Sequence, residues 1–289
     1  MKRSNFKRLL AGVLSVAVLV TFGTTSHAIT VTQDTSAASL ATALTAGSTG
    51  IIVTGSSLSV NSGDFVASSG TYTNGSGTYG IGAGIVLSSG NVSDYGDGPN
   101  TSPSFTTSYG ILETAAQKAL LDPVTGVFTH FDVTQLNINF DMAPGFFDVF
   151  FNVTFGSEEW AEFVATPFID GFGLYLNGVN IATVGGSPVN INHPLMAAFA
   201  GTELDGVLGS PLGGFPVNTF SGLVNPTGNT LTLIVADSSD DVLDTTVYIS
   251  ALGGTAPPNP NNPVPEPASL LLFGSGLAGL AAWRRKKAA

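Results

Sequence analysis

The 289-residue sequence contains no cysteine, only nine basic residues and few charged residues of any kind. The missing cysteines exclude a disulfide framework. Eight of the bases lie at residues 2–8 and 284–287, so Lys118 is the single base between them, against twenty acidic residues. A nucleic-acid surface is excluded, because phosphate binding needs clustered Lys and Arg. Metal cations are the expected counter-charge.

The N-terminus has the pattern of an export signal. Residues 1–8 hold four bases, residues 9–22 are almost wholly apolar, and Ser26 and Ala28 are the small residues of a cleavage site. We therefore predict a secretory signal peptide over residues 1–28, cleaved after Ala28. An uncleaved N-terminal anchor is the alternative, and export follows on either interpretation.

The C-terminus has the pattern of a membrane tail. Pro265, Glu266 and Pro267 precede an uncharged apolar run at 268–283, which a basic cluster closes. This pattern predicts a transmembrane sorting tail over 268–289 behind a linker at 255–267, whose Pro and Asn content favours extended chain. The basic end should stay in the cytoplasm, so the exported middle is tethered to the inner membrane.

The tail V-P-E-P-A-S-L-L-L-F-G-S-G-L-A-G-L-A-A-W-R-R-K-K resembles the PEP-CTERM sorting signal of Gram-negative bacteria. The resemblance implies that an exosortase, a membrane transpeptidase-like enzyme, cuts near the motif and releases or re-anchors the protein at the cell surface or in the extracellular matrix. It also implies an association with exopolysaccharide and biofilm. A plain membrane anchor that is never cut is the alternative.

Residues 29–254 are predicted to form one all-β domain, an antiparallel β-sandwich of the jelly-roll type with one or two short helices. Apolar residues alternate over 131–140, with a bulge expected at Thr134-Gln135, and over 147–155; Pro144-Gly145 between them predicts a hairpin. Further strands are expected at 51–60, 81–87, 231–235 and 246–252. A second hairpin is expected at Asn177-Gly178, between strands at 172–176 and 179–184. Short helices are expected at 34–44, capped by Asp34-Thr35, and at 109–121, ended by Pro123.

Acidic residues gather at predicted strand ends. Glu158 and Glu159 follow one strand, and because adjacent strand residues point to opposite faces, they should not act as one pair; one of them is expected to face inward. Carboxylate oxygens suit Ca²⁺. Our hypothesis is that a Ca²⁺ ion joins two loops at one end of the sandwich; a solvated acidic turn is the alternative. The candidate ligands are Glu158, Glu159, Asp170, Asp237, Asp241 and Asp244.

Four runs resemble the bacterial surface domain called choice-of-anchor L. They are G-I-V-L-S-S-G-N-V at 84–92, F-G-S-E-E-W at 155–160, I-D-G-F-G-L at 169–174 and A-D-S-S-D-D-V-L-D-T at 236–245. The chain departs from the family pattern at Trp160, Ile169 and Thr245, where the family has Tyr, Asn and Ser. The resemblance implies that the protein is located at the cell surface, but it does not imply a particular biochemical activity.

Catalytic patterns are weak. His130 and His193 lack zinc-site spacing, and there is no G-x-S-x-G run. The first expectation is therefore a non-catalytic, exported surface or matrix protein. The second expectation is a Ca²⁺-dependent, lectin-like module that binds exopolysaccharide through an aromatic side chain such as Trp160. The third is a glycan-processing enzyme that uses Glu158 or Glu159.

Overall fold

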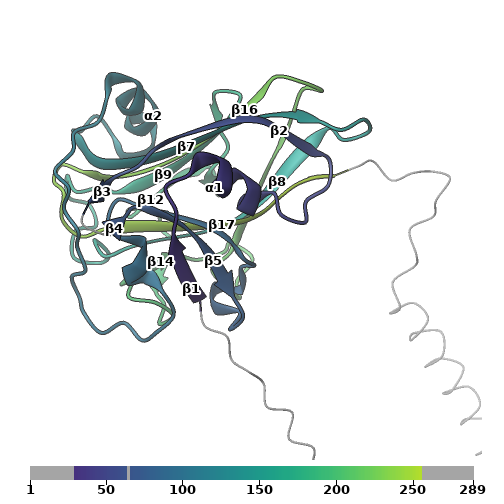
Figure 1. Ribbon diagram of the computed structural model, residues 1–289. Helices are drawn as coiled ribbons and strands as arrows, with labels where there is room; N and C mark the ends of the chain where they lie inside the picture. Colours follow the sequence, from purple (N-terminus) through teal and green to yellow (C-terminus); the bar gives the residue numbers. More distant parts are fainter. Residues whose placement is uncertain (1–28, 64–65, 256–289) are drawn as a thin grey trace, which may run out of the picture.

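The computed structural model describes residues 29–63 and 66–255, which form two facing antiparallel β-sheets (Figure 1). The predicted all-β sandwich is confirmed. The predicted signal peptide, the sorting tail and all of the linker except residue 255 lie outside the described residues. Within 29–63 and 66–255, no helix is both long and apolar enough to cross a membrane.

Each sheet draws strands from distant parts of the sequence. The first sheet has the order β1 (Ile29–Gln33), β5 (Ser69–Asn74), β6 (Gly84–Ser88), β17 (Thr245–Thr255), β8 (Asp148–Ser157), β14 (Gly206–Leu208) and β13 (Met196–Ala198), with β15 (Asn218–Leu223) also paired to β8. The second has the order β11 (Thr183–Val184), β12 (Ser187–Asn190), β9 (Gly171–Leu176), β16 (Asn229–Ser238), β7 (His130–Met142) and β2 (Ile51–Ser59), with β10 (Val179–Asn180) paired to β9. A separate ribbon joins β3 (Ser62–Gly63) to β4 (Val66–Ala67).

The core lies between the sheets because each central strand turns alternate apolar residues inward. In β8 these are Val149, Phe151, Val153 and Phe155, all at most 1% exposed. Residues of β6, β7, β9, β16 and β17 belong to the same cluster. Fully burying one such side chain contributes roughly 1.5–3 kcal/mol, so this alternation is the main determinant of the fold.

The hairpin predicted between 131–140 and 147–155 is wrong. β7 pairs with β16 and β2, whereas β8 pairs with β17, β14 and β15, so the two strands lie in opposite sheets. The turn at Pro144-Gly145 crosses from one sheet to the other. Alternation of apolar residues shows which face of a strand is buried. It does not show whether two strands pair in one sheet or face each other from opposite sheets, because the pattern is the same in both cases.

The remaining turn predictions have mixed outcomes. Asn177 and Gly178 both have positive φ and join β9 to β10, as a two-residue hairpin requires, so that hairpin is confirmed. The pairing stops after Asn180, so 179–184 is not one strand. The bulge in β7 lies at Asp132 and Val133, opposite Ala236, and not at Thr134-Gln135.

The two α-helices differ from their predicted positions. α1 (Ala37–Leu44) is capped by Ser36, and its residues Leu40, Ala41 and Leu44 join the core. α2 (Ala115–Thr125) starts six residues later than predicted and continues past Pro123. Its start is set by a capping box in which Thr114 and Gln117 bond each other's backbone. Two short 3₁₀ turns, η1 (Thr78–Gly80) and η2 (Val92–Tyr95), complete the described helices.

Candidate functional site

Four strand ends bring the acidic residues to one end of the sandwich. β8 and β17 are neighbours in the first sheet, and β9 and β16 are neighbours in the second. The links at 158–170 and 239–244 cross between the sheets at this end. Glu158 and Glu159 follow β8, Asp170 precedes β9, Asp237 is the next-to-last residue of β16, and Asp244 precedes β17.

Asp170 and Asp237 form a buried carboxyl pair. The antiparallel register between β16 and β9 ends at Ala236 and Gly171, so the next position sets Asp237 opposite Asp170. Side chains at opposite positions share a face, with Cβ atoms about 4.5–5.5 Å apart. Both aspartates are at most 1% exposed. Like charges at opposite positions destabilise a sheet, so this pair needs a proton or a cation between its carboxyl groups.

Hydrogen bonds satisfy one member of the pair better than the other. Asp170 accepts the Ser238 N–H at 2.8 Å and the Thr245 hydroxyl at 2.7 Å. Asp237 has an oxygen, Oδ1, without a hydrogen-bond partner. Burial raises the pKa of Asp170 to about 8. Burial also raises the pKa of Asp237 well above its usual range, and repulsion from Asp170 adds to this. A hydrogen bond from Asp237 to Asp170 requires a proton on one of the two carboxyls.

Glu159 is the third member of this group. Its side chain is 2% exposed, and its Oε2 has no hydrogen-bond partner. Burial raises the pKa of Glu159 to about 9, and the charge of Asp170 adds to the rise. The Glu159 N–H donates to the Ser157 hydroxyl at 3.0 Å. We call Glu159, Asp170 and Asp237 the inner carboxylate cluster.

Glu158 has different neighbours from Glu159, as strand alternation predicts, yet both are buried, where we expected one. Glu158 Oε2 accepts the Phe105 N–H at 3.2 Å, and Oε1 has no partner. Burial raises the pKa of Glu158 to about 8. Asp244 accepts the Thr107 N–H at 3.0 Å and the Tyr95 hydroxyl at 3.1 Å. Glu158 and Asp244 thus form a second group.

The six predicted ligands therefore do not meet at one point. The structure brings three of them into the inner carboxylate cluster and two into the second group, whose Asp244 still lies close enough to Asp237 to raise its pKa further. Asp241 is partly exposed and belongs to neither. Within the described part of the chain, no three His, Asp or Glu side chains stand in an arrangement that could already hold a metal ion.

The segment after β6 forms another wall of the site, which the sequence analysis missed. The Ser89 hydroxyl accepts the Thr245 N–H at 2.9 Å, and Ser89 also hydrogen-bonds Asp237. A Cβ atom at Gly90 would lie 1.6 Å from Asp244 Oδ2, so any other residue there would force the Asp244 carboxylate to move. The run G-I-V-L-S-S-G-N-V was the only signal for these residues.

A second missed feature is the irregular segment 100–111, whose backbone is held by carboxylates from distant elements. One of these carboxylates is Glu203, which accepts hydrogen bonds from Thr101 and Ser102, including their backbone N–H groups. Desolvation alone would raise the pKa of Glu203, but the hydrogen bonds have the larger effect, so its pKa is lowered. Glu158 accepts the N–H of Phe105, and Asp244 accepts the N–H of Thr107. Asp132 accepts the N–H groups of Tyr109, Gly110 and Ile111.

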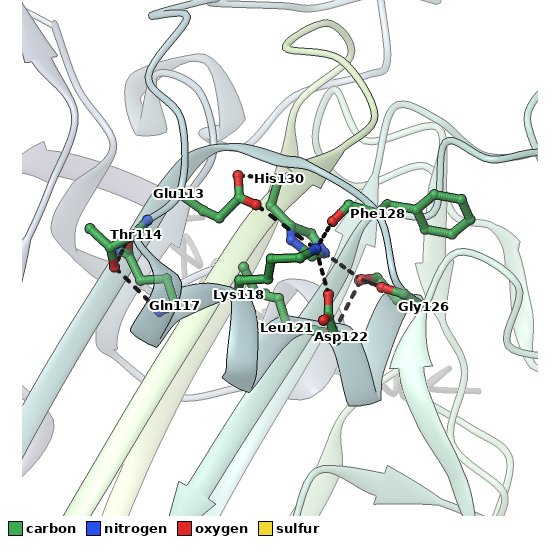
Figure 2. A network of polar contacts seen from close by, with 10 residues as sticks. Glu113, Thr114, Gln117, Lys118, Leu121, Asp122, Gly126, Phe128 and His130 are labelled. Atoms are coloured by element: carbon green, nitrogen blue, oxygen red, sulfur yellow. Dashed lines mark hydrogen bonds and ion pairs between the residues drawn. The ribbon is translucent and has the colours of Figure 1, made fainter.

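The one base of the described residues lies in α2 (Figure 2). Lys118 Nζ is 2.9 Å from Asp122 and 4.0 Å from Glu113, and it donates to the Phe128 carbonyl. His130 beside it is buried and bonds Thr125 through Nε2, and burial lowers its pKa. These partners occupy Lys118. No Lys, Arg or His side chain of the described residues is among the groups that shift the pKa values of the three residues of the inner carboxylate cluster.

Comparisons with known proteins agree with both sequence resemblances. The Choice-of-anchor L domain matches residues 29–196, and the PEP-CTERM protein-sorting motif matches residues 263–286. No curated protein and no solved structure matches. The run at 236–245 lies beyond the residues that the family matches. The structure nevertheless places it at the end of the sandwich where Glu158, Glu159 and Asp170 lie. The sorting motif makes this an exported protein directed to the cell surface. The chain belongs to the choice-of-anchor L domain family.

Proposed function

We propose that this chain is a non-catalytic protein displayed at the surface or in the extracellular matrix of a Gram-negative bacterium. An exosortase-type enzyme processes its tail, and the precursor is held in the inner membrane until then. The mature protein associates with exopolysaccharide in a biofilm. The observation that carries the proposal is the PEP-CTERM motif at residues 263–286, behind a domain of a surface family.

The buried state of the two glutamates supports a non-catalytic role. A glycoside-cleaving pair of carboxylates must flank the bond that it breaks. Glu158 and Glu159 are 1% and 2% exposed, and they have different neighbours. Neither reaches a polysaccharide without rearrangement of the surrounding loops.

The position of Trp160 also favours display over sugar binding by this side chain. A Cβ atom at Gly206 would lie 2.5 Å from the Trp160 Cβ, so the tryptophan lies directly on β14. Trp160 is half-buried and packs against the main core. These contacts favour a packing role over stacking on a sugar ring.

The test uses the full chain in a host that contains an exosortase. The wild-type chain should lose its C-terminal tail, as seen by mass spectrometry, and fractionate with the cell surface or matrix. A Glu266→Ala variant should keep its full length and stay in the inner membrane. Equal processing and location of the two chains would contradict the proposal.

A separate assay tests the absence of catalysis. The wild-type chain and a Glu159→Gln variant are incubated with the exopolysaccharide of the host, and released reducing ends are measured. We expect no release by either chain. Release that the variant abolishes would replace display by glycan processing.

A further inference from the structure

We propose that the inner carboxylate cluster, formed by Glu159, Asp170 and Asp237, binds one Ca²⁺ ion at the end of the sandwich. Glu159 follows β8 of the first sheet, whereas Asp170 precedes β9 and Asp237 lies in β16, which are neighbouring strands of the second sheet. The ion therefore joins the two sheets. This inference concerns the folded domain and is independent of how the tail is sorted.

The first observation is the presence of unpartnered buried oxygens. Glu159 Oε2 and Asp237 Oδ1 have no hydrogen-bond partner, and both residues are at least 98% buried. Leaving a buried polar atom unsatisfied costs about 1–3 kcal/mol, and more for a charged group. Nearly all buried polar groups in folded proteins have partners. These two atoms need either a proton or a ligand that supplies positive charge, and a single cation would satisfy both.

The second observation is the absence of a compensating base. Lys118 is the only Lys or Arg among the described residues, and it bonds Asp122 and the Phe128 carbonyl in the α2 region. Buried charges in proteins are paired or coordinate metals. Because this chain has no other interior base, a cation from solution is the available partner.

The third observation is the chemistry of the surrounding atoms. Three carboxylates offer up to six oxygens, and the hydroxyls of Ser89 and Thr245 bond the two aspartates. Ca²⁺ accepts 6–8 oxygen ligands in flexible geometry, whereas Mg²⁺ demands a near-ideal octahedron. An irregular set of carboxylates and hydroxyls therefore favours Ca²⁺.

Ca²⁺ binding requires a local movement. No three acidic or histidine side chains in the described ranges already surround a common point. Binding has to bring the Glu159 carboxylate and the aspartate pair around one ion, and the register of β9 and β16 sets the positions of the pair. The unpartnered Glu159 Oε2 has no hydrogen bond to lose in this movement.

The experiment uses the full-length chain in detergent, stripped with EDTA and dialysed against CaCl₂, MgCl₂ or NaCl of equal ionic strength. Elemental analysis should find one calcium per chain. Ca²⁺ at about 100 times its dissociation constant should raise the unfolding temperature by about 5–10 °C over NaCl. Mg²⁺ should raise it less.

Three variants locate the ion. Asp170→Asn and Asp237→Asn should lose bound calcium and the temperature rise, while an amide at either position can still bond the remaining carboxylate and keep the fold. Asp241→Asn removes the same charge from the same acidic run, outside the cluster, and should bind calcium as the wild type does. Absence of calcium from the wild type, equal effects of CaCl₂ and NaCl, or unchanged uptake in both cluster variants would each overturn the proposal.

Discussion

The carboxylates that hold the 100–111 segment and those of the inner carboxylate cluster occupy the same sandwich but differ in their partners. Asp132 accepts three backbone N–H groups, from Tyr109, Gly110 and Ile111. Asp237, equally buried, keeps an oxygen without a partner. The supply of N–H donors thus distinguishes Asp132, which holds the backbone of residues 109–111, from Asp237, which we propose to bind a cation.

The pKa values show this difference only at Glu203, because burial raises the pKa of Asp132, Asp244 and Glu158, which also hold the segment. Hydrogen bonds from Thr101 and Ser102 outweigh desolvation at Glu203 and lower its pKa. Burial raises the pKa of Glu159 to about 9, the charge of Asp170 adds to the rise, and no hydrogen-bond donor to Oε2 opposes it. Acidic composition alone therefore does not tell which carboxylates are satisfied.

Removal of the Asp132 carboxylate should have the largest effect. An Asp132→Ala variant loses an acceptor of three backbone N–H groups and places alanine at φ 52°. We expect the free energy of unfolding to fall by about 3 kcal/mol in urea denaturation. Asp241→Ala, at a partly exposed position, should change it by less than about 0.5 kcal/mol. Equal losses would show that the hydrogen bonds to segment 100–111 contribute nothing specific.

A methyl group at Gly90 should have the next largest effect. In Gly90→Ala the new Cβ would lie 1.6 Å from Asp244 Oδ2 and displace that carboxylate from Thr107 and Tyr95. Such overpacking costs about 1–3 kcal/mol. Gly98→Ala is the control, because no atom lies within 4 Å of its added Cβ. Equal unfolding temperatures for the two variants would rule out this close contact.

Neutralising one aspartate of the inner carboxylate cluster should act in the opposite direction. With EDTA present, the Asp237→Asn amide donates to Asp170 without the proton that the two carboxyls must otherwise share, and should raise the free energy of unfolding by up to about 1 kcal/mol. Calorimetry of the variant and the wild type measures this gain. A loss of stability in EDTA would mean that the Asp237 carboxyl is satisfied without a cation.

The smallest expected effect depends on pH. Because the pKa of Glu203 is lowered by folding, its contribution is present above the unfolded pKa and disappears as pH falls through the folded pKa. Glu203→Gln should lower the unfolding temperature by about 1–2 °C at pH 7, as expected for a half-exposed group, and not at all near pH 2. The same difference at both pH values would exclude a role for the ionised carboxylate.

Much of the fold could be predicted from alternation, but not the partners of the strands. The inward residues Val149 and Phe151 follow from period two, and so does the separation of Glu158 from Glu159. Pairing of β7 with β16 and β2 depends on long-range register, which one strand's pattern does not contain. The predicted hairpin failed for this reason.

The helix predicted at 109–121 begins six residues later than expected because distant acceptors set the local backbone. Asp132 holds the N–H groups of 109–111 outside any helix, so α2 starts only after Thr114. In the site, the acidic runs predicted which carboxylates would gather at one end. Their division into two groups, and the approach of Gly90 to Asp244, depend on three-dimensional contacts that spacing does not encode.

A crystal structure of the chain grown with Ca²⁺, with the ion located by its anomalous scattering, tests the central claim most directly. Our account predicts one peak with oxygens of Glu159, Asp170 and Asp237 at about 2.3–2.6 Å. No peak at this position, or a peak only at the partly exposed Asp241, would contradict it.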